Sequence, residues 1–487
     1  MSEASTEDPT RAGWSFDHSY ARLPQAFHAR VNPTPVREPR LVIFNPTLAI
    51  SLGLDPEALR GDEAAAVFAG NRLPEGADPI AQAYAGHQFG HLTRLGDGRA
   101  ILLGEQQTPD GRRYDIQLKG PGRTPYSRGG DGRAALGPML REYLISEAMH
   151  ALGIPTTRSL AVVTTGEPVF REEPLPGAIL TRVAASHIRV GTFVYFAALG
   201  DIEGLQRLTG YTLQRHFPDR VGSGNPARAL LESVLERQAS LVAAWQCVGF
   251  VHGVMNTDNM ALSGETIDYG PCAFIDAYDP EAVFSSIDHQ GRYAFGNQPQ
   301  IVGWNLARFA EALLPVLHAD PKQGVALAQE VIAGYPERFR SHWLTGMRSK
   351  LGLFTTEPED DTLIGDLLDH QRAERADFTN TFRELDPLAP ADASMADWYG
   401  RWTSRLARQS QSPEEVTRLM HSRNPRIIPR NHRVGEALEA AVRKSDLAPF
   451  QHLLAALASP YVETRDSARY TEPPPPGSAP CRTFCGT

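Results

Sequence analysis

Cysteine, long apolar runs and positive charge are all scarce in this sequence. Its 487 residues include 4 cysteines, too few for a disulfide scaffold of this length, which fits a reducing compartment. No stretch approaches the roughly 20 apolar residues that a membrane-spanning helix needs. The formal net charge of -9 argues against general affinity for nucleic acid backbones. The first residues show neither a secretory nor a transit-peptide pattern, so we expect a cytoplasmic protein that binds neither membranes nor nucleic acid.

The sequence changes from a strand-rich segment to a helix-rich one. One helix is predicted from about Pro138 to the residues that stop it, Gly153 and Pro155. After about Ser186, apolar residues recur at helical spacing, and one long helix should end at Gly249. Short apolar runs between glycines predict strands at residues 100–105, 114–118, 159–165, 169–171 and 178–183. We therefore expect an α+β fold.

Two segments nearer the C-terminal end are predicted to lack regular structure. The acidic residues 357–361 are typical of a solvated linker or turn. The residues beyond Pro473 are rich in proline and small side chains, so they should form an extended, mobile tail.

Two features of the strand-rich segment can bind phosphate. Gly96 and Gly98 precede Arg99 and an apolar strand, and glycines let backbone amides approach phosphate oxygens, although an isolated pair is more often a tight hairpin turn. Lys119 ends an alternating strand, and Glu142 lies on the helix that follows. This order suits a lysine that contacts nucleotide phosphates and is held by a helical carboxylate. A surface lysine and an unrelated glutamate are the alternative.

The most specific pattern lies in the helical part of the chain. His252 opens a segment that ends at Asn259, and Asp268 begins an Asp-Tyr-Gly sequence 9 residues later. A kinase catalytic loop has this frame, and its Asn and Asp oxygens are hard ligands suited to Mg²⁺ on polyphosphate. The Arg-Asp pair that kinases carry after the histidine is absent here, so ordinary γ-phosphoryl transfer is in doubt. Asp258 is the nearest carboxylate that could serve instead.

Arginines add further candidate phosphate contacts. Arg182 ends an apolar strand and is expected to point into a cleft, with Arg189 close behind it in the sequence. Three arginines in a glycine-rich loop could equally bind phosphate, oriented by Asp131, or be solvated: Arg123, Arg128 and Arg133. His87 and His91 lie four residues apart, but no adjacent Glu supports a zinc site, so buried or hydrogen-bonded histidines are favoured.

Long segments of the chain resemble the selenoprotein O (YdiU) family of kinase-like protein adenylyltransferases. They are YAGHQFGHLTRLGDGRA, DIQLKGPGRTPYSRGGDGRAALGPMLREYLISEAMHALGIPTTR, GFVHGVMNTDNM and IDYGPCAFIDAYDP. The resemblance implies a two-lobed, protein-kinase-like fold in a cytoplasmic bacterial enzyme. It also implies that ATP binds in a flipped orientation and that AMP passes to Ser, Thr or Tyr hydroxyls of proteins, self-modification included, with release of pyrophosphate.

The resemblance implies roles for individual residues as well. Asp258 would accept the proton of the acceptor hydroxyl, and Asn259 with Asp268 would hold Mg²⁺ or Mn²⁺. Asp268 and the remaining positions would contact the nucleotide or its phosphates, namely Gly96, Gly98, Arg99, Lys119 paired with Glu142, Asp131, Gly132, Arg182 and Arg189.

A redox gate is also implied by the resemblance. Cys272 follows the Asp-Tyr-Gly sequence, and a disulfide from it to Cys481 or Cys485 would restrain the catalytic loop until a thioredoxin-type or glutaredoxin-type partner opened it. The alternative is that Cys272 is a small buried side chain and that the two tail cysteines pair with each other.

On this basis five regions are predicted. They are an N-terminal extension (1–80), a strand-rich nucleotide-binding lobe (81–183), a helical catalytic lobe (184–350), a C-terminal helical region (351–460) and a flexible tail that contains cysteines (461–487). Two other functions stay open. One is an inactive pseudokinase scaffold, because absence of the catalytic-loop aspartate is its usual mark, although both metal ligands are retained. The other is a small-molecule phosphotransferase, but such enzymes also rely on that aspartate.

Overall fold

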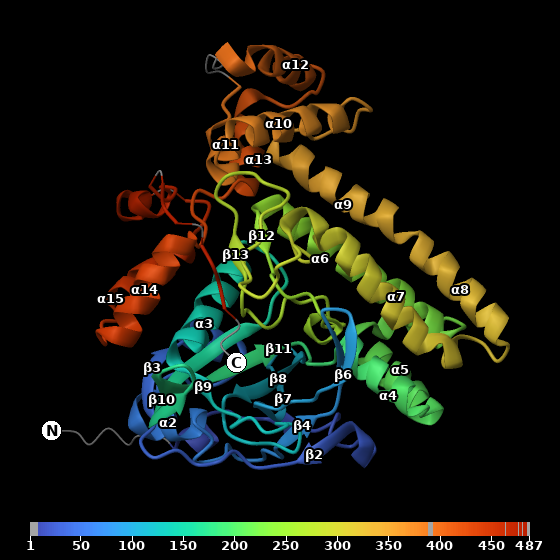
Figure 1. The fold of residues 1–487 in the computed structure, drawn as a ribbon, viewed down its shortest axis with the longest axis vertical. Helices are drawn as coiled ribbons and strands as arrows, with labels where there is room; N and C mark the ends of the chain where they lie inside the picture. The colour runs from blue at the N-terminus through green and yellow to red at the C-terminus, as the bar shows by residue number, and fades with distance from the viewer. Residues whose placement is uncertain (1–7, 388–392, 463, 476, 480, 485–487) are drawn as a thin grey trace.

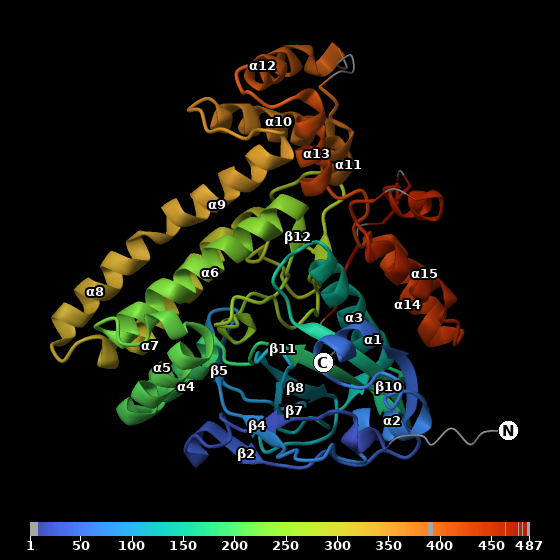
Figure 2. The same cartoon turned by 180° about the vertical axis from the view of Figure 1, so that it is seen from behind.

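The fold has a sheet lobe and a helical lobe. The computed structural model describes residues 8–387, 393–462, 464–475, 477–479 and 481–484. In Figures 1 and 2 the strands gather in the lower part of the molecule, and the long helices rise above them. Antiparallel strands dominate the N-terminal region and helices the C-terminal region, so the predicted α+β, two-lobed fold is confirmed.

A nine-stranded antiparallel sheet forms the first lobe. Its strands follow the order β2-β4-β7-β8-β11-β10-β3, with β1 beside β7 and β9 beside β11. The bounds are Phe16–Asp17 for β1, His28–Arg30 for β2, Arg40–Phe44 for β3, Ile80–Gln82 for β4, Ala100–Gln107 for β7, Arg113–Lys119 for β8, Ala134–Ala135 for β9, Arg158–Phe170 for β10 and Pro174–Ala184 for β11. The first three strands and the start of β4 lie before residue 81, so the predicted N-terminal extension contributes to this sheet. The predicted region limits themselves stay predictions.

Each face of the sheet is covered by a helix. Along β11, Ile179 faces the cluster that includes α2 (Gly61–Phe68), and the next residue, Leu180, faces the cluster that includes α3 (Leu136–Ala151). This alternation follows from the two-residue period of a strand. Lys119, which ends β8, and Glu142 on α3 are thereby brought to the same side of the sheet.

One predicted break in the sheet is wrong. We expected separate strands at 159–165 and 169–171, but β10 is continuous through both segments. Its register against β11 shifts between Thr164 and Pro168, and Gly166 has a φ of 69°. A β-bulge therefore accommodates Gly166 and Pro168, the two residues that suggested a turn between separate strands.

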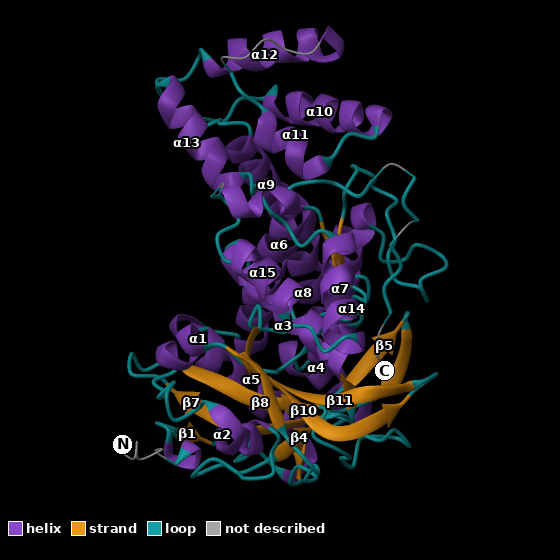
Figure 3. Ribbon diagram, turned by 90° about the vertical axis from the view of Figure 1, so that its left-hand side faces the viewer, coloured by secondary structure: helices purple, strands orange, loops and turns teal. Residues whose placement is uncertain are grey.

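The helical lobe is built around α6, which ends at Gly249 as predicted, with a φ of 73° at this glycine. Figure 3 shows this lobe stacked on the sheet. Among the described residues, no helix combines the length and the apolar composition that crossing a membrane requires. The helices that follow the sheet are α4 (Val190–Leu199), α5 (Ile202–His216), α6 (Pro226–Val248), α7 (Gln298–Leu317), α8 (Pro321–Ala333), α9 (Tyr335–Lys350), α10 (Asp360–Glu374), α11 (Phe378–Glu384), α12 (Ala396–Leu406), α13 (Pro413–Arg423), α14 (Asn431–Arg443) and α15 (Ala448–Leu457).

Two segments predicted to be irregular make contacts with the rest of the chain. Asp360 begins α10, is 0% exposed and pairs with Arg405 and Arg348, so the acidic segment is not simply a solvated linker. In the tail, buried Thr483 donates its hydroxyl to the carbonyl of Pro271 at 2.7 Å, and its backbone bonds to the chain at Phe284. These hydrogen bonds, which no local sequence pattern reveals, connect the tail to Pro271, beside Cys272, and to Phe284. The predicted mobility of the tail stays a prediction.

Candidate active site

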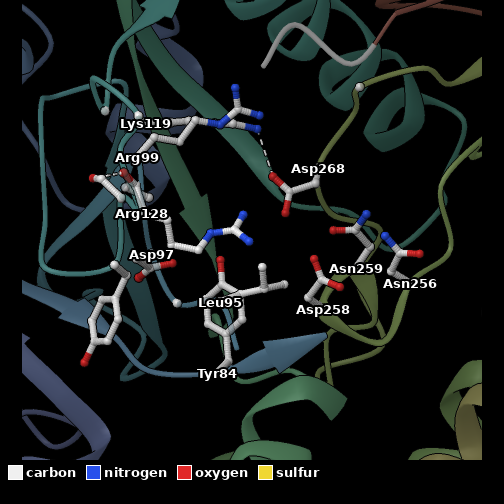
Figure 4. A pocket seen from close by; sticks show the side chains of 18 of the residues that line it. Tyr84, Leu95, Asp97, Arg99, Lys119, Arg128, Asn256, Asp258, Asn259 and Asp268 are labelled. Carbon is white, nitrogen blue, oxygen red and sulfur yellow. Dashed lines mark hydrogen bonds and ion pairs between the residues drawn. The ribbon is translucent and has the colours of Figure 1, made fainter. Parts of the chain in front are cut away.

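A cavity of about 350 Å³ lies where the sheet meets the loop that follows α6 (Figure 4). β12 (Phe250–Val251) and β13 (Ala273–Phe274) pair at the base of this loop, which carries His252 to Asp268. Glu142 is buried outside the cavity lining. The other predicted site residues line the cavity, namely Gly96, Gly98, Arg99, Lys119, Asp131, Gly132, Arg182, Arg189, Asp258, Asn259 and Asp268.

The predicted pair of Lys119 and Glu142 is present. Lys119 Nζ lies 2.6 Å from Glu142 Oε2 and 2.8 Å from Asp268 Oδ1. Arg182 donates to the same two carboxylates, each at 2.6 Å. Burial alone would raise the pKa of Glu142, but Arg182 and Lys119 hold it below its usual value. Glu142 therefore stays ionised behind the cavity and positions both cations.

Asp268 is the point on which three cations converge. Besides Lys119 and Arg182, Arg189 Nη1 lies 2.9 Å from its Oδ2. Burial would raise the pKa of Asp268, but Arg182 and Lys119 keep it well below its usual value. Its backbone φ of 62° is uncommon for a residue with a side chain, and such strain clusters at functional sites.

The glycine loops at the cavity entrance pack too closely for larger residues. A Cβ on Gly132 would lie 2.0 Å from the carbonyl oxygen of Gly122, and the φ of Gly132 is 67°. A Cβ on Gly96 would lie 2.5 Å from the ring of Tyr126. Asp131 accepts hydrogen bonds from Arg171 at 2.8 and 3.2 Å, so its own contact to a ligand would compete with this pair. The loops are thus ordered by close packing and by an ion pair.

Asp258 lines the same cavity, and Arg189 Nη1 donates to its backbone carbonyl at 2.8 Å. Gln88 donates its amide to both carboxylate oxygens, at 2.9 and 3.1 Å. Burial raises the pKa of Asp258 to about 6, although Arg189 opposes the shift. A carboxylate with a pKa near 6 is mostly ionised at neutral pH, yet basic enough to accept a proton.

The oxygens near Asp268 suit a divalent cation that is shared with a substrate. Asn259 donates its amide to the carbonyl of Val254 at 2.8 Å, and its Oδ1 makes no hydrogen bond to the described residues. Within the described part of the chain, no group of three or more His, Cys, Asp or Glu side chains could hold a metal ion. Mg²⁺ is commonly held by one or two carboxylates together with phosphates and water, so Asn259 and Asp268 fit that chemistry.

Several residues that line the cavity are not among the site residues predicted from the sequence. The ring of Tyr84 lies 4.6 Å below the Arg189 guanidinium. Burial raises the pKa of Asp97 to about 6, and Arg189 opposes this. Further examples are Gln88, Asn256, Tyr126 and Arg171. Of the three loop arginines that the sequence left open, Arg128 and Arg133 line the cavity and Arg123 is not among the lining residues. Asp97 lies between Gly96 and Gly98, the two predicted loop glycines, and this position is the sequence signal from which its place in the site could have been predicted.

The two histidines of the GHQFGH sequence lie on a hairpin and not on a helix. They belong to β5 (Ala85–Gln88) and β6 (His91–Arg94). His87 Nδ1 lies 3.1 Å from Thr257 Oγ1, which confirms the expected hydrogen-bonded histidine at this position. His91 is exposed, so for it that expectation is wrong.

Comparison with known proteins places the chain in a family. The profile of the family described as Protein adenylyltransferase SelO matches residues 11–458. A protein of Anoxybacillus flavithermus named Protein nucleotidyltransferase YdiU is 61% identical over 98% of this chain and 100% of its own length. Proteins of the same name from Geobacillus kaustophilus and Brevibacillus brevis are 61% and 60% identical, each over 98% of this chain and over 100% and 98% of their own lengths. The chain therefore belongs to the SelO family of nucleotidyltransferases.

Proposed function

We propose that this enzyme transfers AMP from ATP to Ser, Thr or Tyr hydroxyls of proteins, its own included, and releases pyrophosphate. The observation that carries the proposal is the convergence of Lys119, Arg182 and Arg189 on Asp268, with the Asp258 carboxylate lining the same cavity. Preorganised cations of this kind suit the charge of a triphosphate. The names of the relatives, protein nucleotidyltransferases, support a protein acceptor.

Asp258 is the proton acceptor in this proposal. The acceptor hydroxyl attacks the α-phosphorus of ATP, a new O–P bond forms, and the bond from the α-phosphorus to the departing pyrophosphate breaks. The hydroxyl proton passes to Asp258. The flipped nucleotide explains why the kinase Arg-Asp pair is dispensable, because the α-phosphate then occupies the place where a kinase presents the γ-phosphate.

Asn259 and Asp268 would hold Mg²⁺ or Mn²⁺, which neutralises phosphate charge when it is bound. Lys119, Arg182 and Arg189 would then exchange part of their contact with Asp268 for phosphate oxygens. Glu142 keeps Lys119 and Arg182 in place during this exchange, because it pairs with both from behind the cavity.

The proposal includes a redox gate through the tail. Thr483 docks on Pro271, the residue before Cys272, and Cys481 lies two residues before Thr483. Both cysteines are free thiols in this structure, and Cys485 lies outside the described residues. A disulfide from Cys272 to one of the tail cysteines would tether the loop that carries Asp268, and a thioredoxin-type or glutaredoxin-type reductant would release it.

The experiment is intact-protein mass spectrometry after incubation with ATP and Mg²⁺ or Mn²⁺. Wild-type protein should gain the mass of AMP, and Asp258→Asn should lower that rate by at least about a hundredfold. Asp62→Asn, at an exposed position on α2, is the matched control and should match wild type. A phosphate adduct would favour a phosphotransferase, and absence of any transfer would favour an inactive scaffold.

A further inference from the structure

The β5–β6 hairpin is an arm that joins the sheet lobe to the loop that carries His252 to Asp268, which we call the catalytic loop. It forms a two-stranded sheet of its own, beside α4 (Figure 2). Its turn residues, Phe89 and Gly90, have φ values of 49° and 94°, as a two-residue type I′ turn requires. The type I′ turn lets the arm stay narrow at its tip.

Backbone groups at the end of the arm bind the catalytic loop directly. The amide of His87 donates to Thr257 Oγ1 at 2.8 Å, and the amide of Phe89 donates to Asn256 Oδ1 at 3.1 Å. Asn256 also accepts a hydrogen bond from the Tyr293 hydroxyl at 2.6 Å. These contacts hold the arm in place whatever the side chain at position 88 is.

Two glycines let the arm approach Asp258 at backbone distance. A Cβ on Gly86 would lie 2.1 Å from Asp258 Oδ1. A Cβ on Gly191, at the start of α4, would lie 2.0 Å from the carbonyl oxygen of Ala85. The strand therefore runs directly beneath the Asp258 carboxylate, with no space for a larger side chain between them.

Gln88 completes this contact. In the part of the chain that the structure describes, it is the one side chain that hydrogen-bonds the Asp258 carboxylate, and it reaches both oxygens. A carboxylate can rotate about its single bond, and a donor shared by both oxygens fixes the plane of the group. The lone pairs on the far side of the carboxylate then remain for an acceptor hydroxyl.

We infer that Gln88 is a positioning residue that orients the Asp258 carboxylate toward the acceptor hydroxyl. The inference rests on the proposed function, because it takes Asp258 as the proton acceptor. Gln88 contributes no charge and no proton to the reaction. Its effect is geometric, and misplacement of a reacting group by about 1 Å can cost on the order of a hundredfold in rate.

The test measures AMP incorporation with Gln88→Leu and Gln88→Glu. Leucine removes the donor, and glutamate places a second carboxylate against Asp258. The maximal rate should fall by about 10- to 100-fold in both variants, and in Gln88→Leu the half-saturating ATP concentration and the melting temperature should stay at wild-type values. Leu92→Thr, at an exposed position on the same hairpin, is the control and should keep the full rate.

A double variant separates positioning from a structural role. If Gln88 acts through Asp258, then Gln88→Leu added to Asp258→Asn should cost almost nothing further, because residues that act as a unit are not additive. Full activity of Gln88→Leu, a parallel loss of ATP affinity and melting temperature, or an additive double variant would each overturn the inference. If Asp258→Asn itself transfers AMP at the wild-type rate, the proposed role of Asp258 fails and the positioning role falls with it.

Discussion

At the residue scale, Glu142 is the centre of the site although it does not line the cavity. It is buried and pairs with Lys119 and Arg182 at 2.6 Å each, and both cations also reach Asp268. Removing one partner of a buried ion pair leaves the other uncompensated. Single substitutions of Glu142, Lys119 or Arg182 should therefore lower transfer activity for the same reason, which is the loss of these shared ion pairs.

This coupling predicts non-additive losses of transfer activity. Lys119→Ala should slow transfer on the order of a hundredfold, and adding Glu142→Ala should cost little more. The measurement is the rate of AMP incorporation for the two single variants and the double variant. Glu203→Ala, on the exposed side of α5, supplies the comparison and should combine additively with Lys119→Ala. Independent losses at Lys119 and Glu142 would show that the two do not act as a pair.

Lys350 is a buried lysine whose ammonium lies against aromatic rings. It is 2% exposed, and its ammonium lies 4.3 Å from the centre of the Phe382 ring. Burial lowers the pKa of Lys350 from 10.5 to about 8. Below pH 8 the folded protein must keep this charge in an apolar site, which costs up to about 3 kcal/mol of stability.

The predicted consequence is a pH-dependent stability difference from Lys350→Met. Between about pH 8 and pH 10.5 the unfolded chain binds the Lys350 proton and the folded protein does not, so wild-type stability should rise with pH relative to the variant. Denaturant unfolding at pH 7 and pH 10 measures the two free energies. Lys350→Met should be the more stable protein at pH 7, with the difference smaller at pH 10. If the difference in unfolding free energy between wild type and Lys350→Met were the same at pH 7 and pH 10, the lowered pKa of Lys350 would be contradicted.

At the element scale, local signals found β7, β8, β10, β11, α3 and α6, but not the strands before residue 80 or the contacts between distant elements. Lys119 and Glu142 are 23 residues apart and follow the strand-then-helix order, so their contact could be predicted. Gln88 and Asp258 are 170 residues apart, and no periodicity connects a hairpin to a loop at that distance. Gly166 suggested a turn because the sequence alone does not show that a neighbouring strand accommodates a bulge.

The tail carries the redox prediction. Oxidation should join Cys272 to Cys481 or Cys485 and slow AMP transfer, and reductant should restore the rate. Burial raises the pKa of the Cys272 thiol to about 11, so the bridge should form slowly at neutral pH. Peptide mapping under non-reducing conditions, with Cys247→Ser as the control, identifies the pairing. Finding Cys272 as a free thiol in oxidised protein, with an AMP transfer rate that does not respond to reductant, would rule out the redox gate.

At the scale of the whole molecule, two sets of contacts join the lobes. Arg215 of α5 pairs with Asp115 of β8 at 2.9 Å and also with Glu105 of β7. The β5–β6 hairpin holds the loop of residues 252–268 through Thr257 and Asp258. Fixed connections between the lobes suit a reaction that depends on placing a nucleotide against a single carboxylate.

Incubation with ATP labelled separately at the α- and γ-phosphates tests the central claim most directly. The α-label should become covalently attached to protein, and the γ-label should appear in free pyrophosphate. Attachment of the α-label should fall at least about a hundredfold in Asp258→Asn. Attachment of the γ-label to protein, with the α-label left in free ADP, would show phosphoryl transfer and contradict the account.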